Sequence, residues 1–424
     1  MIEPGDLYML ILLMSTAVLV GTQDTLVVSL DAAVQRALEV SPAVRAAEAA
    51  IAAPRGARAE AIWPFPVNPT LDFARVRRRS ADGTSYDREF GIGGEIQIAG
   101  QGFIRAGAAG KRITAAEERV GNVVRTTALE TRLAFKTLIS AQRRKALVDS
   151  AAQFMDRLVR VARARLDAGE INGLDYNAAL LQAARQRSAA ERTRGDRIAA
   201  ASDLARLMAL PQDSVPRAAT APLLPAITLP PEEQLIGLAL GRRPDYRAGL
   251  LERDAANQQV TAANLDGWIP ALQLGAVAGR EDGTDDLLGF SIGLAIPLFR
   301  RGQAERGLAV AERAAAEATL EATQRRIQAE IIAAVGRYER ALAAERLFAE
   351  EVLEAARENV QLTERAFDEG KVGIADLIVL QSAAVEAQLE YVAVREEAYT
   401  GWFELAAALD TDPADVARIV GGQP

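Results

Sequence analysis

The sequence predicts a mainly α-helical protein built from two copies of one unit, with a β-hairpin inserted among the helices of each copy. Three observations support this prediction. Half of the 424 residues are hydrophobic but only 5% are aromatic, a composition that favours long helices joined by thin side-chain layers. Matching phrases recur along the chain at a spacing of about 200 residues. In each copy, two short stretches alternate apolar residues with small or polar ones at a period of two, as strands do.

The duplication is clearest where the strands are expected. The phrase "PTLDFARV" at Pro69 recurs as "PALQLGAV" at Pro270, 201 positions later. The phrase "FGIGGEIQI" at Phe90 recurs as "FSIGLAIPL" at Phe290, 200 positions later. We assign residues 23–210 to the first copy, 211–231 to a proline-rich linker, 232–410 to the second copy and 411–424 to a C-terminal tail.

The same order of elements is expected in both copies. In the first copy we expect a helix over 30–62, strands over 69–79 and 86–99, a long helix over 102–168 and a returning helix over 175–208. In the second copy we expect a helix over 231–265, strands over 270–280 and 288–298, a long helix over 302–369 and a returning helix over 376–409. The strands are long enough to cross a membrane when tilted. The long helices carry apolar residues in alternating steps of three and four, which is the spacing of a coiled-coil seam.

The N-terminal residues 1–22 are predicted to be a cleaved export signal. The apolar run from Leu7 to Val20 is short for a transmembrane helix and suits the core of a signal peptide. Glu3 and Asp6 stand where basic residues usually precede such a core, so a buried helix or a misassigned start codon is the alternative.

A short glycine-containing phrase joins the long and returning helices of each copy. "DAGEINGLD" in the first copy and "DEGKVGIAD" in the second share glycines at Gly169 and Gly370 and end at Asp175 and Asp376. Glycine at these positions predicts a turn that ends a helix. The two aspartates then fall at the start of the returning helix, where a carboxylate caps the first turn. Capping alone would explain these aspartates without any further function.

The composition excludes several classes of function. The chain has no cysteine and no histidine, so thiol nucleophiles, Ser-His-Asp triads and the usual zinc sites lack a necessary residue. A net charge of -8 and a pI near 5.1 disfavour nucleic-acid binding. The segment "GAAGKR" lacks the first glycine and the Ser or Thr of a phosphate-binding loop. We therefore expect no enzyme activity, no cofactor and no metal site.

In this order, the parts resemble those of the outer-membrane efflux channel family, the TolC-like proteins. The most specific phrases are "ARLDAGEINGLDYNAALLQA", "RAFDEGKVGIADLIVLQSA", "SLDAAVQRALEVSPAVRAAEAAI" and "GFSIGLAIPLFRRGQAERGLAVAERAAAEA". The resemblance implies a homotrimer in which each chain lends four strands to a 12-stranded barrel in outer-membrane lipid. It also implies an α-helical barrel through the periplasm that docks to a periplasmic adaptor and an inner-membrane pump. The implied function is a passive conduit for efflux or secretion, gated at its periplasmic mouth.

The resemblance also implies roles for residues of the two turns. Asp175 and Asp376 match acidic residues that line the constriction of the periplasmic mouth. The implied hairpin tip and adaptor contact comprises Gly169, Gly370, Leu166, Phe367 and Lys371. Phe367, Val372 and Val379 depart from the polar residues found at gate positions in the family, so we expect the closed mouth to be held mainly by apolar packing.

Two questions stay open at the level of sequence. The phrases "VNPTL" and "GFSIGLAIPLF" resemble the branch of the family that serves heavy-metal efflux, but no thiol or imidazole is present to hold a metal. The competing interpretation of the whole chain is a periplasmic coiled-coil adaptor or scaffold without a membrane barrel. Partition into the outer membrane distinguishes the two, because a scaffold is released without detergent.

Overall fold

The computed structural model of the chain describes residues 25–80, 83–211, 213–222, 224–281, 285–299, 301–348 and 350–420. The export signal predicted for residues 1–22 lies outside these residues. The chain divides into two compact units, each of which takes segments from both copies. Unit 1 comprises Met1–Ser41, Glu130–Leu224 and Arg340–Tyr399, and unit 2 comprises Pro42–Leu129, Pro225–Glu339 and Thr400–Pro424.

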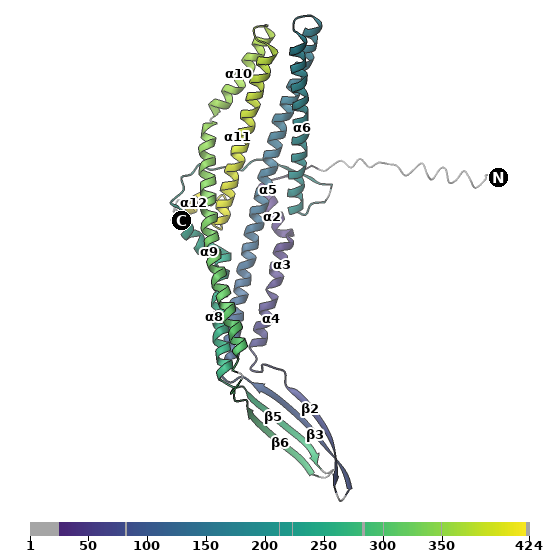
Figure 1. Ribbon diagram of the computed structural model, residues 1–424, viewed down its shortest axis with the longest axis vertical. Coiled ribbons are helices and arrows are strands. Elements are labelled where there is room, and N and C mark those ends of the chain that lie inside the picture. Colours follow the sequence, from purple (N-terminus) through teal and green to yellow (C-terminus); the bar gives the residue numbers. More distant parts are fainter. Residues whose placement is uncertain are drawn as a thin grey trace, which may run out of the picture. The chain divides into compact units, whose positions relative to one another are not determined.

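The elements repeat in the same order in the two copies (Figure 1). The first copy contains β1 (Thr25–Val28), α2 (Leu30–Val40), α3 (Pro42–Ala50), α4 (Ala52–Ala61), β2 (Thr70–Ser80), β3 (Gly83–Ile96), α5 (Gln101–Asp167) and α6 (Gly173–Leu207). After β4 (Val215–Ala218), the second contains α7 (Glu232–Arg242), α8 (Pro244–Trp268), β5 (Leu272–Glu281), β6 (Asp285–Leu294), α9 (Gln303–Leu347), α10 (Glu350–Asp368) and α11 (Ile374–Ala408). The short α12 (Val416–Val420) follows.

Prolines divide the first helix of each copy, which the sequence analysis had treated as single helices over 30–62 and 231–265. α2 ends before Pro42 and α7 ends before Pro244, and the residue before each proline has an extended ψ of 119° or 125°. A proline ring disfavours the helical conformation at the preceding residue. Since the two prolines are 202 positions apart, the break is a property of the duplicated unit. α4 starts two residues before Pro54, whose missing N–H cannot bond to the carbonyl four residues earlier.

The two long helices differ. α5 is continuous over nearly the predicted range, whereas the helix expected over 302–369 is divided into α9 and α10. At the end of α9 the amide of Phe348 donates to the carbonyl of Glu345 at 3.0 Å, a tighter turn than that of an α-helix. Glu345 stands between Leu342 and Ala349 at a position where the three-four spacing would place an apolar residue, and its carboxylate pairs with Arg395 of α11 at 3.4 Å.

The second strand of each hairpin begins about three residues earlier than the sequence indicated. Pairing continues outward to Ser80 opposite Gly83 in the first hairpin and to Glu281 opposite Asp285 in the second. Polar residues that had been assigned to turns therefore belong to the strands. This is possible because an antiparallel sheet can carry polar residues on a face that water reaches.

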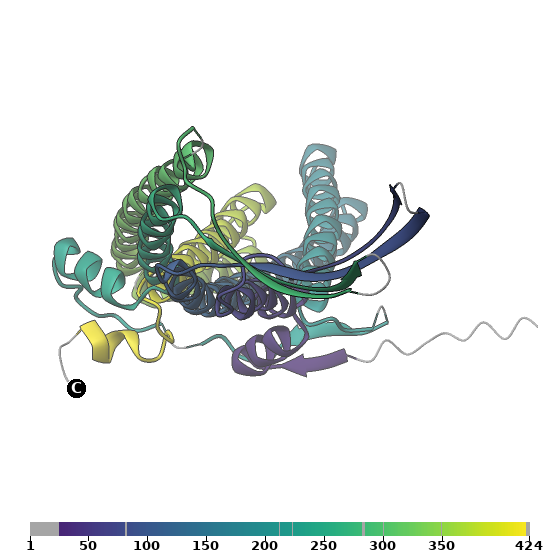
Figure 2. The same ribbon diagram turned by 90° about the horizontal axis from the view of Figure 1, so that it is seen from below.

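Unit 2 contains a four-stranded antiparallel sheet in the order β2-β3-β5-β6 (Figure 1). The central pair, β3 with β5, joins the two copies, with Ile92 opposite Ala276. β2 and β6 each have one neighbour among the described strands and form the edges. Figure 2 shows that the sheet is curved rather than flat.

Unit 1 contains a parallel strand pair that the sequence analysis missed. β1 pairs with β4, and β4 lies in the segment predicted to be a linker. Pro216 is tolerated within β4 because the strand pairs on one side only, with Leu26 opposite the proline. These strands cover one end of a core cluster formed with α2, α5 and α6. Its buried members are Val28, Ala33, Phe135, Leu138, Ile139, Ala141, Ala200, Ala201, Leu204, Met208 and Ala218.

Unit 2 contains a buried ion-pair network. The side chain of Arg243 is fully buried and pairs with Asp245 at 2.7 Å and with Glu330. Burial alone would raise the pKa of Asp245, but its hydrogen bonds to Arg243 and the nearby arginines hold that pKa below its usual value. Arg125 donates to the carbonyl of Ala407 at 3.1 Å near the end of α11. The network fixes the start of α8 against α9.

Candidate functional site

The turn between α5 and α6 ends the long helix with two backbone hydrogen bonds. The N–H of Gly169 donates to the carbonyl of Leu166 at 2.9 Å, and the N–H of Glu170 donates to the carbonyl of Arg165 at 2.8 Å. Gly169 has a φ of 74°, in the left-handed region that residues with a Cβ rarely adopt. This pattern is the Schellman motif.

The turn between α10 and α11 repeats this geometry. The N–H of Gly370 donates to the carbonyl of Phe367 at 3.0 Å, and the N–H of Lys371 donates to the carbonyl of Ala366 at 2.8 Å. The φ of Gly370 is 71°. The two glycines thus lie at equivalent points of two equivalent turns, as their positions in the repeated phrase indicated.

The returning helices are capped by different halves of a capping box. In α6 the side chain of Asn172 accepts a hydrogen bond from the N–H of Asp175 at 2.9 Å. In α11 the carboxylate of Asp376 accepts a hydrogen bond from the N–H of Gly373 at 3.1 Å. A complete capping box contains both bonds. The carboxylate of Asp376 therefore takes part in its cap, whereas the cap at Asp175 uses only the backbone N–H of that residue.

A compact apolar cluster lies behind both turns in unit 1, and we call it the tip cluster. It brings together α5, α6, α10 and α11, and its buried members are Phe154, Met155, Leu158, Ala162, Ala179, Ala183, Phe367, Ile374 and Leu377. Phe367 is only 4% exposed. Phe367, expected at the hairpin tip and adaptor contact, has its side chain packed in the interior of the tip cluster of the single chain.

Arg165 joins the first turn to the second. Its guanidinium carbon lies 4.2 Å from the centre of the Phe367 ring, and its Nη2 donates to the Phe367 carbonyl at 3.2 Å. Arg165 therefore links the α5–α6 turn to the α10–α11 turn by a cation–π contact with the Phe367 ring and by a hydrogen bond to the Phe367 carbonyl. Sequence reasoning missed this role. The alignment of the repeated phrases places Leu166 opposite Phe367, and Arg165 is the residue just before it.

The remaining predicted tip residues are accessible. Leu166 is half-buried, and Lys371 is exposed with its Nζ at 2.5 Å from a carboxylate oxygen of Glu369. Large apolar residues near the turns are also exposed, among them Leu174 at 77% and Val379 at 64%. Exposed apolar groups of this size favour contact with another protein surface.

α11 also meets the length and composition of a membrane-spanning helix, alone among the helices within the described residues. Ile374 and Leu377 of its first turns pack in the tip cluster. Apolar composition in α11 therefore reflects packing between helices, at least in this part of the helix.

The two faces of the sheet have opposite chemistry. Residues directly opposite in the strand pairing share a face, so the register assigns every residue to one face. The apolar face carries Leu71, Phe73, Phe90, Ile92, Ile96, Leu272, Leu274, Leu288, Phe290, Ile292 and Leu294. The polar face carries Asp72, Arg78, Asp87, Glu89, Glu95, Gln273, Glu281, Asp285 and Ser291, with glycines and a few apolar residues, Val76, Val277 and Leu287, between them. On the apolar face Leu71 is 80% exposed and Phe290 is 84% exposed.

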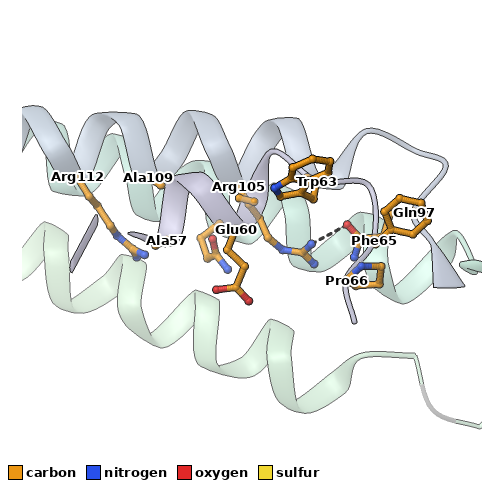
Figure 3. Close-up of a pocket in the computed structure, with 12 residues that line it drawn as sticks. Ala57, Glu60, Trp63, Phe65, Pro66, Gln97, Arg105, Ala109 and Arg112 are labelled. Atoms are coloured by element: carbon orange, nitrogen blue, oxygen red, sulfur yellow. Dashed lines mark hydrogen bonds between the residues drawn. The ribbon is translucent and has the colours of Figure 1, made fainter. Parts of the chain in front are cut away.

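A cavity in unit 2 lies where α4, α5 and the strand connections meet (Figure 3). Figure 3 shows Arg105 directed to Gln97, to which its Nη1 donates at 2.9 Å, and Arg105 also pairs with Asp266. The lining includes Trp63, Phe65 and Glu60. Arg105 is thus held by Gln97 and Asp266, and the residues that line the cavity include no nucleophile with an adjacent base, so we assign the cavity to the junction between helices and strands.

Comparison with known proteins supports the same fold. Residues 235–411 match the family model described as outer membrane efflux protein. No curated protein matches the chain in sequence. A membrane protein from Pseudomonas aeruginosa has a solved structure similar to this chain, with a TM-score of 0.77, 20% identity, and coverage of 90% of this chain and 93% of that one.

Two further solved structures give the same result. That of CusC has a TM-score of 0.77 at 16% identity and covers 92% of this chain and 94% of that one. That of the outer membrane protein VceC from Vibrio cholerae has a TM-score of 0.75 at 19% identity and covers 90% and 96%. Residues 235–411 are therefore recognised as an outer membrane efflux protein domain, and the chain as a whole has the fold of the TolC-like efflux channels.

Proposed function

We propose that the chain is the outer-membrane channel of a tripartite efflux or secretion system. Three chains form one passive conduit that receives cargo from a periplasmic adaptor and an inner-membrane pump. The observation that carries this proposal is the four-stranded sheet, which has an exposed apolar face, a polar face and two edges that pair with no other described strand. The family match of residues 235–411 supports the same function.

The sheet requires partners if it lies in lipid. Unpaired backbone N–H and C=O groups along β2 and β6 would each cost several kcal/mol in a hydrocarbon environment. Four strands are too few to close a barrel, so the edges have to pair with other copies of the sheet. Three copies give a 12-stranded barrel with the apolar face toward lipid and the polar face toward the pore.

The duplication predicts the pairing between subunits. β6 corresponds to β3 with an offset of 200, and β2 corresponds to β5 with an offset of 201. If β6 of one chain meets β2 of the next as β3 meets β5, the pair of Ile92 and Ala276 becomes Ile292 opposite the partner subunit's Arg75. Ile292 and Arg75 both lie on the apolar face of the sheet, and this agreement is required because residues directly opposite in a strand pair share a face.

Cysteine cross-linking tests this pairing in a chain that has no native cysteine. The double variant Ile292→Cys/Arg75→Cys is expected to form covalent dimers and trimers on mild oxidation, because directly opposite Cβ atoms lie about 4.5–5.5 Å apart. The control Ile292→Cys/Val76→Cys places the second thiol on the opposite face and is expected to stay uncrosslinked. Equal cross-linking of the two variants would contradict the proposed barrel.

Membrane fractionation tests the localisation and the alternative function together. Expressed with an export signal in a bacterium that lacks its own channel, the chain is expected in the outer membrane as a trimer extracted only by detergent. A soluble monomer or dimer would favour the coiled-coil scaffold instead.

We further propose that the two turns form the gated periplasmic mouth, with Asp175 and Asp376 of three chains around the constriction. Carboxylates grouped in this way favour cations. The variant Asp175→Asn/Asp376→Asn is expected to reduce cation selectivity in planar bilayers, while the matched charge removal Glu354→Gln on exposed α10 is expected to leave selectivity unchanged. Unchanged selectivity in the double variant would exclude these carboxylates from the constriction.

The proposed contact with the adaptor involves Gly169, Gly370, Leu166 and Lys371, with Phe367 supporting the surface from within. Export of heavy metals stays a prediction from the phrases "VNPTL" and "GFSIGLAIPLF". Expression of the chain in a host that lacks its own channel distinguishes the two kinds of cargo. Restored growth on metal salts would indicate metal export, and restored growth on drugs would indicate drug export.

A further inference from the structure

The apolar face of the sheet carries a group of arginines at the end nearest the hairpin loops. The strand register places Arg75, Arg77, Arg79, Arg88 and Arg280 on this face, and we call this group the arginine belt. All five side chains are exposed. The belt begins where the apolar residues end, one pair beyond Phe73 and Phe90.

The arrangement of the belt is electrostatically unfavourable for the isolated chain. Arg75 lies directly opposite Arg88, and Arg88 lies directly opposite Arg280. The row continues to Asp286 on β6, so it holds three guanidinium groups and one carboxylate. Like charges directly opposite in a sheet destabilise it. A row of this kind favours an anionic group that lies across several strands.

Arg78, which lies on the polar face, is paired with acidic residues. Arg78 pairs with Asp87 at 3.1 Å and with Glu281, so its charge is neutralised within the sheet. On the belt, Arg280 pairs with Asp286 at 2.9 Å and Arg75 stacks on the Tyr86 ring at 4.6 Å. Within the described residues, no ion pair is found for the other three arginines of the belt. The unneutralised positive charge is therefore confined to one face.

The belt is also continuous with an aromatic layer. The Phe73 and Phe90 rings lie 4.8 Å apart immediately below it, and Tyr86 lies within it. Aromatic residues of this kind mark the boundary between the hydrocarbon core and the headgroups of a bilayer. Three successive rows of the belt extend about 13 Å along the strand. That is close to the depth of a headgroup layer when the strands are tilted.

We propose that the arginine belt binds the phosphate-bearing headgroups of anionic lipids in the leaflet that surrounds the hairpin-loop end of the barrel. The inference rests on the proposed function, because it requires the apolar face to be turned toward lipid. Guanidinium groups bind phosphate through two parallel hydrogen bonds, and a row across three strands offers a multivalent site for one headgroup layer. The belt thereby fixes the depth of the barrel in the membrane and relieves its own repulsion.

The test compares the full-length trimer with the variant Arg75→Gln/Arg77→Gln/Arg88→Gln. Purified protein is incorporated into bilayers of phosphatidylcholine containing either lipid A or phosphatidylglycerol, and retained anionic lipid is measured by native mass spectrometry after detergent exchange. Each arginine near an anionic surface contributes about a fivefold change in binding, so retention is expected to weaken on the order of 100-fold in the variant. Inorganic phosphate is the control for binding of free anions.

Two further variants keep the test decisive. Arg185→Gln/Arg340→Gln/Arg357→Gln removes three exposed arginines from the helices and is expected to retain lipid as the wild type does. The lysine variant Arg75→Lys/Arg77→Lys/Arg88→Lys keeps the charge and is expected to retain more anionic lipid than the glutamine variant but less than the wild type, because lysine lacks the paired donors of a guanidinium. It provides the comparison if the glutamine variant assembles poorly, and retention equal to that of a well-assembled glutamine variant would contradict the inference.

The outcomes separate the inference from the function on which it rests. A wild-type chain that is not a membrane trimer would overturn the proposed function. A wild-type trimer that conducts, together with a glutamine variant that retains lipid A and phosphatidylglycerol as the wild type does, would overturn the inference alone. A change of ion selectivity without any change in lipid retention would place the belt in the pore and would also overturn it. Competition by inorganic phosphate at equal concentration would identify a free-anion site instead of a headgroup site.

Discussion

The ring of Phe367 offers a direct test of what holds the two hairpin turns together. The ring is 4% exposed, packs in the tip cluster and lies 4.2 Å below the Arg165 guanidinium. Replacing a buried phenylalanine with alanine typically costs about 3–5 kcal/mol, and the lost cation–π contact accounts for roughly 0.5–2 kcal/mol of stabilisation in partly buried sites. We expect Phe367→Ala to reduce the local stability of the tip by at least about 3 kcal/mol.

Hydrogen exchange read by mass spectrometry measures this local stability. A loss of about 3 kcal/mol corresponds to exchange on the order of 100-fold faster in peptides from the ends of α5 and α10. Leu362→Ala is the matched control, because Leu362 lies on α10 but is 47% exposed. Exchange in Phe367→Ala no faster than in this control would refute the role assigned to the ring.

The same variant tests the expectation that apolar packing closes the mouth. If the tip cluster is the latch, Phe367→Ala is expected to raise mean single-channel conductance, whereas Asp175→Asn/Asp376→Asn is expected to change selectivity more than conductance. Higher conductance in the aspartate variant alone would assign the latch to charge instead. The comparison is informative because the cap at Asp376 and the ring at Phe367 lie on opposite sides of the same turn.

Three further predictions concern the backbone and pH. Gly169→Ala is expected to lower the local stability of the turn by about 1 kcal/mol, because the φ of Gly169 is 74°. Gly195→Ala is expected to raise the stability of α6 by roughly 0.5–1 kcal/mol, because Gly195 lies within the helix and a Cβ there would lie in open space. Hydrogen exchange measures both changes. Ala209→Gly is expected to raise the thermal midpoint, because Ala209 has a φ of 47° at the end of α6; an unchanged midpoint would contradict the strain. Burial raises the pKa of Asp410, so ionisation of Asp410 lowers stability as the pH rises through that raised pKa. Asp410→Asn is therefore expected to be more stable than wild type at neutral pH and to lose the advantage in acid; urea unfolding at several pH values checks this.

Much of the fold could be predicted because its signals are local. A glycine at the end of a helix specifies a left-handed residue, so the turns at Gly169 and Gly370 could be placed from sequence alone. Alternation with a period of two located both hairpins to within about three residues. The order of elements then followed from the duplication, since every assignment could be checked against its copy.

The errors arose where the outcome depends on partners distant in sequence. The pairing of β1 with β4 joins segments about 190 residues apart, and nothing in "VPRA" indicates a strand by itself. The stacking of Arg165 on Phe367 is a contact between copies, so neither local pattern reveals it. The helix breaks at Pro42 and Pro244 differ from these errors, because they have a local signal. The residue before a proline avoids helical geometry, so the expected single helices over 30–62 and 231–265 could have been divided from sequence alone.

Contacts between the copies indicate the symmetry of the duplication. In unit 2, Arg112 pairs with Glu312 at 3.4 Å, and in unit 1, Gln182 donates to Ser382 at 3.2 Å. In each case the partners are 200 positions apart, so each residue contacts the vicinity of its own counterpart. If the two copies are related by a rotation about an axis parallel to the helices, corresponding residues lie at the same height along that axis. If they are related by a two-fold axis perpendicular to the helices, corresponding residues lie at the same height only close to that axis.

Within its own unit, each contact therefore favours a rotation about an axis parallel to the helices between the two copies of the repeat. Within the sheet of unit 2, two copies do not complete such a rotation, because β2 and β6 each have only one neighbour among the described strands. In the proposed trimer, the contact that joins the copies within one chain is also the template for the contact between chains. Substitutions at Gln182 or Ser382 are consequently expected to weaken the interface between subunits as well as the packing within each chain, since the same surfaces meet at both.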